Sequence, residues 1–79
     1  EYFNDSILLY PNPVKNILGI DSDFGGNYQI YDLNGRDIVK GKILKGKNEV
    51  DTSLLQSGLY FVKFNNENGS VVKKVIKEW

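Results

Sequence analysis

The stretch Asp21–Asn27, DSDFGGN, places carboxylate and hydroxyl oxygens at alternate positions and follows them with two glycines. Loops that bind calcium share this composition, because Ca²⁺ takes oxygen ligands and glycine allows a tight turn. The full EF-hand spacing is missing, and no glutamate stands at the closing position. Turns between strands favour the same residue types. We therefore interpret this stretch as a turn and expect no metal or cofactor.

Three further aspartates, Asp32, Asp37 and Asp51, are candidates for the paired carboxylates of acid–base catalysis. They stand near the ends of different predicted strands, and no cleft can be inferred that would bring two of them together. Asp32 precedes Asn34-Gly35, where its side chain would brace a turn. The chain has no His and no Cys, which excludes Ser-His-Asp and Cys-His catalysis, histidine metal sites and disulfides. We expect that the protein is not an enzyme.

Two lysine-rich stretches, Lys40–Lys47 and Lys73–Lys77, suggest anionic partners. Ten Lys and Arg against ten Asp and Glu give a formal net charge of zero, which argues against the broad basic face of a nucleic-acid-binding protein. The commoner explanation is that lysines protect exposed strand edges against aggregation. The aromatic residues, 13% of the chain, are expected mainly in the core.

Short apolar segments separated by turn residues run through the 79-residue chain. They alternate in polarity and recur about every 8–12 residues, which is typical of a sandwich or barrel. The sequence therefore predicts a single all-β domain, a seven-stranded antiparallel Ig-like β-sandwich. The predicted strands are Ser6–Tyr10, Lys15–Ile20, Tyr28–Leu33, Arg36–Leu44, Asn48–Asp51, Leu59–Phe64 and Ser70–Lys77.

The alternation also predicts core side chains, which are Leu9, Leu18, Ile20, Ile30, Tyr60 and Val62. Asn34-Gly35 separates two predicted strands, and both residue types tolerate positive φ, so a type I′ hairpin turn is expected. Asn65–Gly69 is expected to form a longer hairpin loop. Thr52–Gln56 is a candidate for one helical turn with Leu54 and Leu55 facing inward.

Four pieces of sequence, taken in order, resemble one known family. They are LLYPNPVKNILGI, YQIYDLNGRDIVKGKI, VDTSLLQSGLYFVKF and NGSVVKKVIK. Each piece alone is common, but their order and separation closely resemble the type A C-terminal sorting domain of the type IX secretion system of Bacteroidetes. The resemblance covers Leu8 to Lys77, and the ending Glu78-Trp79 is less usual in such domains.

The resemblance implies a secretion signal. Residues 1–79 would form a single C-terminal sorting domain, with residues 1–5 as a linker remnant, behind an N-terminal passenger domain. After transit through the periplasm, the folded domain would be recognised by the type IX outer-membrane translocon and its shuttle protein. A sortase-like cysteine protease would then remove the domain and leave the passenger at the cell surface or secreted.

Nine residues are candidates for recognition or for maintaining the motif: Pro11, Asn12, Pro13, Asp32, Gly35, Gly58, Tyr60, Lys73 and Lys74. The prolines would form a rigid corner in which Asn12 hydrogen-bonds its neighbours. Gly58 would allow a tight entry into its strand, and the lysines of the last strand, Lys77 included, would offer positive charge to a partner. An exposed or swapped last strand would also permit a homodimer.

The alternative function is a small carbohydrate-binding or adhesive β-sandwich module of a secreted enzyme. An exposed, flat aromatic triplet beside polar side chains would favour this alternative. Largely buried aromatic side chains and an exposed terminal strand would favour the sorting signal.

Overall fold

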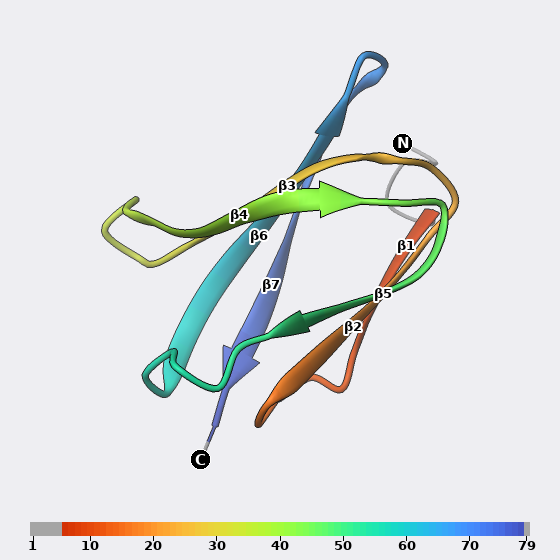
Figure 1. Ribbon diagram of the computed structural model, residues 1–79. Coiled ribbons are helices and arrows are strands. Elements are labelled where there is room, and N and C mark those ends of the chain that lie inside the picture. Colours follow the sequence, from red (N-terminus) through yellow and green to blue (C-terminus); the bar gives the residue numbers. More distant parts are fainter. Residues whose placement is uncertain (1–5, 79) are drawn as a thin grey trace.

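The computed structural model describes residues 6–78, which form seven strands and no α-helix (Figure 1). The strands are β1 (Ile7–Tyr10), β2 (Ile17–Ser22), β3 (Gly26–Tyr31), β4 (Asp37–Ile43), β5 (Gly46–Asp51), β6 (Gly58–Asn66) and β7 (Gly69–Lys77). All seven predicted strands are confirmed, with ends shifted by two residues at most. The predicted linker remnant, residues 1–5, lies outside the described residues. No helix in the described part of the chain has the length and apolar character to cross a membrane.

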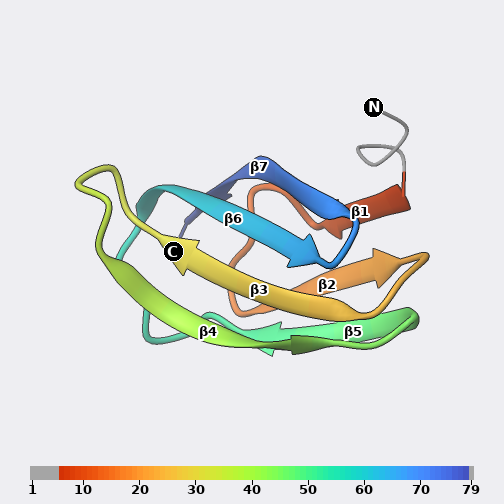
Figure 2. The same cartoon turned by 90° about the horizontal axis from the view of Figure 1, so that it is seen from above.

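The strands form two sheets, with orders β1-β2-β5 and β4-β3-β6-β7, and every pair of neighbouring strands is antiparallel. Figure 2 shows β1 and β7 along one side of the sandwich and β4 and β5 along the other. The pairing of β2 with β5 and of β3 with β6 is that of immunoglobulin-like domains. The predicted fold class is therefore confirmed.

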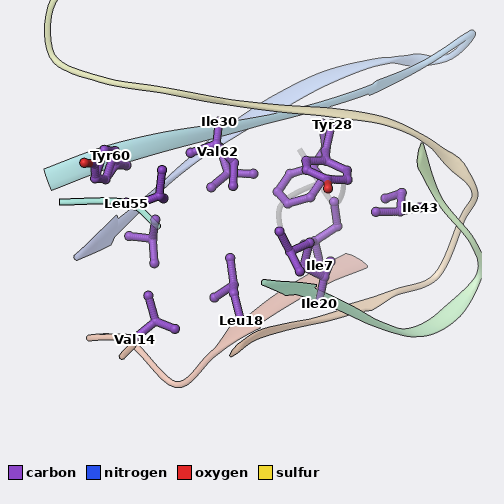
Figure 3. Close-up of a cluster of buried hydrophobic side chains, with 13 residues drawn as sticks. Ile7, Val14, Leu18, Ile20, Tyr28, Ile30, Ile43, Leu55, Tyr60 and Val62 are labelled. Atoms are coloured by element: carbon purple, nitrogen blue, oxygen red, sulfur yellow. The ribbon is translucent and has the colours of Figure 1, made fainter. Parts of the chain in front are cut away.

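Alternating side chains of the two sheets meet in one core between them (Figure 3). Five of the six predicted core residues are buried, whereas Leu9 is half-buried and packs against the core from its margin. On the same face of β1, Ile7 is the deeply buried residue, with 1% exposure. The alternation thus identifies the correct face of β1 but overestimates the burial of Leu9, which lies beside an open edge.

The hairpin between β3 and β4 forms as predicted, but the predicted type I′ turn is wrong. Among the described residues no residue other than glycine has positive φ, so Asn34 does not take the conformation that type I′ requires, whereas Gly35 has a φ of 84°. A bulge at Ile30–Tyr31 shifts the register, and the strands separate before the turn. The Asp32 carboxylate fills this wider loop by accepting hydrogen bonds from backbone N–H groups.

The predicted helical turn at Thr52–Gln56 is also wrong. The Leu55 N–H donates to the Thr52 carbonyl at 3.0 Å, but the segment is a turn without helix. The Thr52 hydroxyl donates to the Asn16 carbonyl at 2.7 Å, and this bond ties the segment to the chain just before β2. Leu55 is buried as expected, whereas Leu54 is 98% exposed.

Candidate recognition surface

The corner Pro11–Pro13 connects β1 to β2 and runs beside β7 (Figure 2). Both of its X-Pro peptide bonds are cis. The expectation that the Asn12 side chain hydrogen-bonds its neighbours in the corner is wrong. Asn12 Nδ2 donates to the Lys74 carbonyl at 3.1 Å, and its Oδ1 accepts from the Ile76 N–H at 2.9 Å. The corner is therefore fastened to the last strand by one side-chain amide.

Val14 extends this contact along β7. Its N–H donates to the Ile76 carbonyl at 2.7 Å, and its carbonyl accepts from the Glu78 N–H at 2.9 Å. Val14 also forms a parallel bridge with Lys77, and its side chain is buried. The segment from Asn12 to Val14 thus acts as a short substitute strand that closes the second half of the β7 edge.

The first half of the β7 edge is open. Ile76 turns both its N–H and its C=O toward the substitute strand, and residues two apart on a strand direct these groups to the same edge. The backbone groups of Ser70 and Val72 therefore point away from β6. Within residues 6–78 nothing pairs with them. The prediction of an exposed terminal strand holds for this half only.

A shallow groove of about 730 Å³ lies between β1 and β7. Its lining combines apolar side chains with two lysines: Ile7, Leu8, Leu9, Asn12, Leu59, Lys73, Lys74 and Ile76. Leu8 is 61% exposed and Ile76 is 48% exposed, so much of this apolar surface is in contact with water. We call this groove, together with the open half of the β7 edge, the edge groove.

Lys73 and Lys74 both border the edge groove, from opposite faces of β7. Lys73 is half-buried and Lys74 is exposed. The expectation that Lys77 also offers its charge to a partner is wrong. Lys77 is 4% exposed, and its Nζ donates to the Leu55 carbonyl at 3.0 Å, because position 77 faces the core side of β7.

Asp32 and Gly35 lie in the β3–β4 hairpin, on the opposite side of the sheet from β7. Asp32 Oδ1 accepts from the N–H groups of Asn34 at 2.9 Å and Arg36 at 3.0 Å, and Oδ2 lies 3.2 Å from Arg36 Nη2. The backbone hydrogen bond from Arg36 is the main cause that lowers the pKa of Asp32. This confirms that Asp32 braces the hairpin.

Gly58 and Tyr60 hold the connection from β5 to β6. Gly58 opens β6 with a φ of 148°, which side-chain-bearing residues rarely adopt. Tyr60 is 7% exposed, and its hydroxyl donates to the Gln56 carbonyl at 2.7 Å. This bond resembles the tyrosine corner of immunoglobulin-like domains. Of the nine candidate residues, the structure thus brings Asn12, Lys73 and Lys74 together at the edge groove.

The apolar lining of the edge groove was not among the residues expected from the sequence. Leu8, Leu59 and Ile76 are apolar residues at positions of their strands that face away from the core. Such residues indicate a contact surface when they cluster. The alternation alone does not reveal the cluster, because it depends on β1 and β7 lying side by side.

Two further sequence expectations concern metals and sugars. In the described part of the chain, no group of three or more His, Cys, Asp or Glu residues is placed to hold a metal. Tyr28, Tyr60 and Phe64 are buried, and the half-buried Tyr31 and Phe61 stack with ring centroids 5.6 Å apart. Among the described residues this stack is a pair, whereas the carbohydrate-module alternative expects an exposed triplet.

A family model described as the secretion system C-terminal sorting domain matches residues 8–78. The matched region includes the Pro11–Pro13 corner and, apart from Ile7, all residues of the two sheets and of the edge groove. No curated protein matches the chain.

Proposed function

The chain belongs to the family of secretion system C-terminal sorting domains, and from this membership we propose that it is the signal by which the type IX machinery recognises an attached passenger. The family is one of sorting signals rather than enzymes, and its members direct export to the cell surface or the medium. We infer further that the passenger lies N-terminal to residues 1–79, which form one domain. On this proposal the passenger waits in the periplasm until the outer-membrane translocon and its shuttle protein bind the folded domain.

The edge groove is the observation that supports a recognition role most directly. An open strand edge offers backbone donors and acceptors, so a partner segment can add as a further strand beside Ser70 and Val72. The neighbouring apolar side chains Leu8 and Ile76 would accept alternate side chains of that segment. The edge is open over a few residues only, so the added strand would be short.

Lys73 and Lys74 would favour a partner segment that carries negative charge. Neither lysine forms an ion pair with a described residue. Charges at the rim of an interface mainly increase the rate of encounter and exclude partners of the wrong sign. We therefore propose that the translocon or shuttle segment is apolar with flanking acidic side chains. A second copy of the chain is a competing occupant of the same edge.

We propose that the signal is recognised in its folded form. The open edge exists only when β7 is paired with β6 and fastened by Asn12 and Val14 at its end. An unfolded chain would not present the same short edge. We propose that a sortase-like cysteine protease removes the domain after export, with the cut ahead of β1.

The test is an export assay in a host with a working type IX system. The chain is fused to the C-terminus of an inert periplasmic reporter, and the exported fraction is measured for three forms of the chain and for the reporter alone. The unchanged chain is expected to carry the reporter to the surface or medium, and Lys73→Glu with Lys74→Glu is expected to retain it in the periplasm. Lys45→Glu with Lys47→Glu is the matched control and is expected to export normally.

Circular dichroism on each purified chain verifies that the fold is intact. Equal export of both lysine pairs would overturn the role of Lys73 and Lys74. Export of the reporter without the chain would overturn the sorting function itself.

A further inference from the structure

The net charge of zero conceals a separation of charge between the two outer faces of the sandwich. On the sheet β4-β3-β6-β7, the strand residues that point away from the core include four lysines, Lys40, Lys42, Lys63 and Lys74. Asp37 is the one carboxylate among the described strand residues of this face, and its Oδ2 lies 3.6 Å from Lys40 Nζ and accepts from Gln29 Nε2 at 3.3 Å. A ligand carboxylate would therefore compete with Asp37 for these two side chains, whereas Lys42 and Lys63 form no ion pair with a described residue. The outer face of β1-β2-β5 has the opposite balance, with Asp21, Glu49 and Asp51 against Lys47. The charges that cancel over the whole chain are therefore segregated by sheet, so that one outer face is basic and the other acidic.

Amide side chains lie between the lysines of this basic face. The strand register places Gln29 between Lys40 and Lys63, and it places Asn27 between Lys42 and Asn65. Neighbouring strands are about 4.8 Å apart, so the strand positions of Lys40 and Lys63 lie about 10 Å apart across Gln29. The face thus alternates cationic groups with groups that both donate and accept hydrogen bonds.

An aromatic pair occupies the next row. Tyr31 and Phe61 are direct partners in the register of β3 and β6, and their rings stack with an interplanar angle of 26°. Two shallow hollows of about 410 and 210 Å³ lie on this face and share Gln29 in their lining. The larger is lined by Lys40 and Lys42, and the smaller by Lys63 and Tyr31 among others.

We propose that this basic face binds an anionic polysaccharide, a chain of sugar rings that carry carboxylates. Lysines attract the carboxylates, amide side chains pair with the several hydroxyls of each ring, and an aromatic pair offers apolar surface to the C–H face of a sugar. Two hollows that meet at Gln29 suit an elongated ligand. Nucleic acid is less favoured, because its backbone offers few hydroxyl partners for three neighbouring amides.

This inference does not depend on the edge groove. Lys74 borders both surfaces, so it is left unchanged in the test. The purified 79-residue chain is titrated with polygalacturonate as the probe, and neutral dextran, inorganic polyphosphate and a single-stranded oligonucleotide are titrated in parallel. We expect binding of polygalacturonate that weakens with added salt, and no binding of dextran.

Two double lysine variants distinguish a specific binding site from a general effect of positive charge. Lys40→Gln with Lys63→Gln is expected to weaken polygalacturonate binding about tenfold or more, which corresponds to 1.4 kcal/mol. Lys45→Gln with Lys47→Gln removes the same charge outside this face and is expected to change binding less than about twofold. Equal losses in the two pairs would overturn the proposal, as would absence of polygalacturonate binding.

Tyr31→Ala tests the aromatic contribution. We expect it to weaken polygalacturonate binding and to leave polyphosphate binding unchanged, because polyphosphate has no apolar face. Tighter binding of the oligonucleotide than of polygalacturonate would contradict the polysaccharide assignment and indicate a nucleic-acid surface. A thermal melt of each variant verifies that the sandwich is intact, and Phe61→Leu provides a milder change of the same pair if Tyr31→Ala unfolds.

Discussion

The side-chain amide of Asn12 binds Ile76, 64 positions further along the chain: Oδ1 accepts the Ile76 N–H at 2.9 Å. The Nδ2 of the same amide donates to the Lys74 carbonyl at 3.1 Å. A side-chain amide has the same donor and acceptor groups as a peptide unit, so Asn12 takes the place of one residue of a neighbouring strand. This contact marks where the closed part of the β7 edge begins.

Asn12→Ala is expected to destabilise the domain by about 1–2 kcal/mol, because two hydrogen bonds to the β7 edge are lost. The clearest readout is hydrogen exchange, in which the Ile76 amide should lose protection relative to the amides that β7 donates to β6. Asn34→Ala is the control, since no described hydrogen bond uses its side chain. Unchanged protection of Ile76 would show that Asn12 does not hold this edge.

Val62→Asp should unfold the domain. Val62 is fully buried in the core, and an unpaired carboxylate there costs several kcal/mol, against a total stability on the order of 5–10 kcal/mol for a domain of this size. Val62→Ala should cost about 2 kcal/mol. Val72→Ala, on the exposed face of β7, should cost less than about 0.5 kcal/mol. Urea denaturation orders the three variants, and comparable losses for Val62→Ala and Val72→Ala would contradict the assigned core.

Stability should fall in acid partly through Asp32. The pKa of Asp32 is lowered in the folded chain, chiefly by the Arg36 backbone N–H. Its contribution to folding stability is therefore fully present above its unfolded pKa, about 4, and is lost as the pH falls through its folded pKa. Asp32→Asn removes this titration. Urea unfolding of both proteins at pH 7 and pH 3 should give a smaller acid loss for the variant. Equal acid losses would mean that Asp32 is not a stabilising carboxylate.

Lys77→Ala should destabilise the domain by about 1–3 kcal/mol, because it removes a buried stem and leaves the Leu55 carbonyl without its donor. Lys74→Ala should be nearly neutral, since Lys74 is exposed and has no ion pair with a described residue. Thermal melting of both variants tests the contrast. An unchanged melting temperature for Lys77→Ala would show that the hydrogen bond of Lys77 to Leu55 does not stabilise the domain.

The strands and most of the core follow from the sequence because a period of two gives a direct signal for a half-buried strand. Val62 illustrates this, since it faces inward in β6 as its alternation predicts. The burial of Lys77 could not be predicted, because the two faces of β7 have the same polarity in the sequence. Over Val71–Ile76 each face carries two apolar residues and one lysine, so the alternation does not identify the inner face.

The recognition surface was harder to predict because it depends on contacts between distant segments. Asn12 was expected to bond locally, as short polar side chains at turns commonly do, and its partners in β7 follow only from the packing of β1 beside β7. The basic face likewise depends on contacts between segments that are distant in the sequence. Lys40 and Lys63 are 23 positions apart in the sequence and become neighbours through β3.

If a partner binds the open half of the β7 edge by strand addition, the substitution Val72→Pro should abolish that binding. Proline removes the outward N–H of residue 72 and leaves the pairing of β7 with β6 intact, because position 72 directs its backbone away from β6. Val72→Ala removes the side chain and retains the N–H, so it is the matched control.

Both variants are placed behind the periplasmic reporter, and their fold is verified by circular dichroism. The measured quantity is the exported fraction of the reporter. We predict that Val72→Ala exports like the unchanged chain and that Val72→Pro, although folded, leaves the reporter in the periplasm. Normal export of a folded Val72→Pro chain would contradict strand addition at β7.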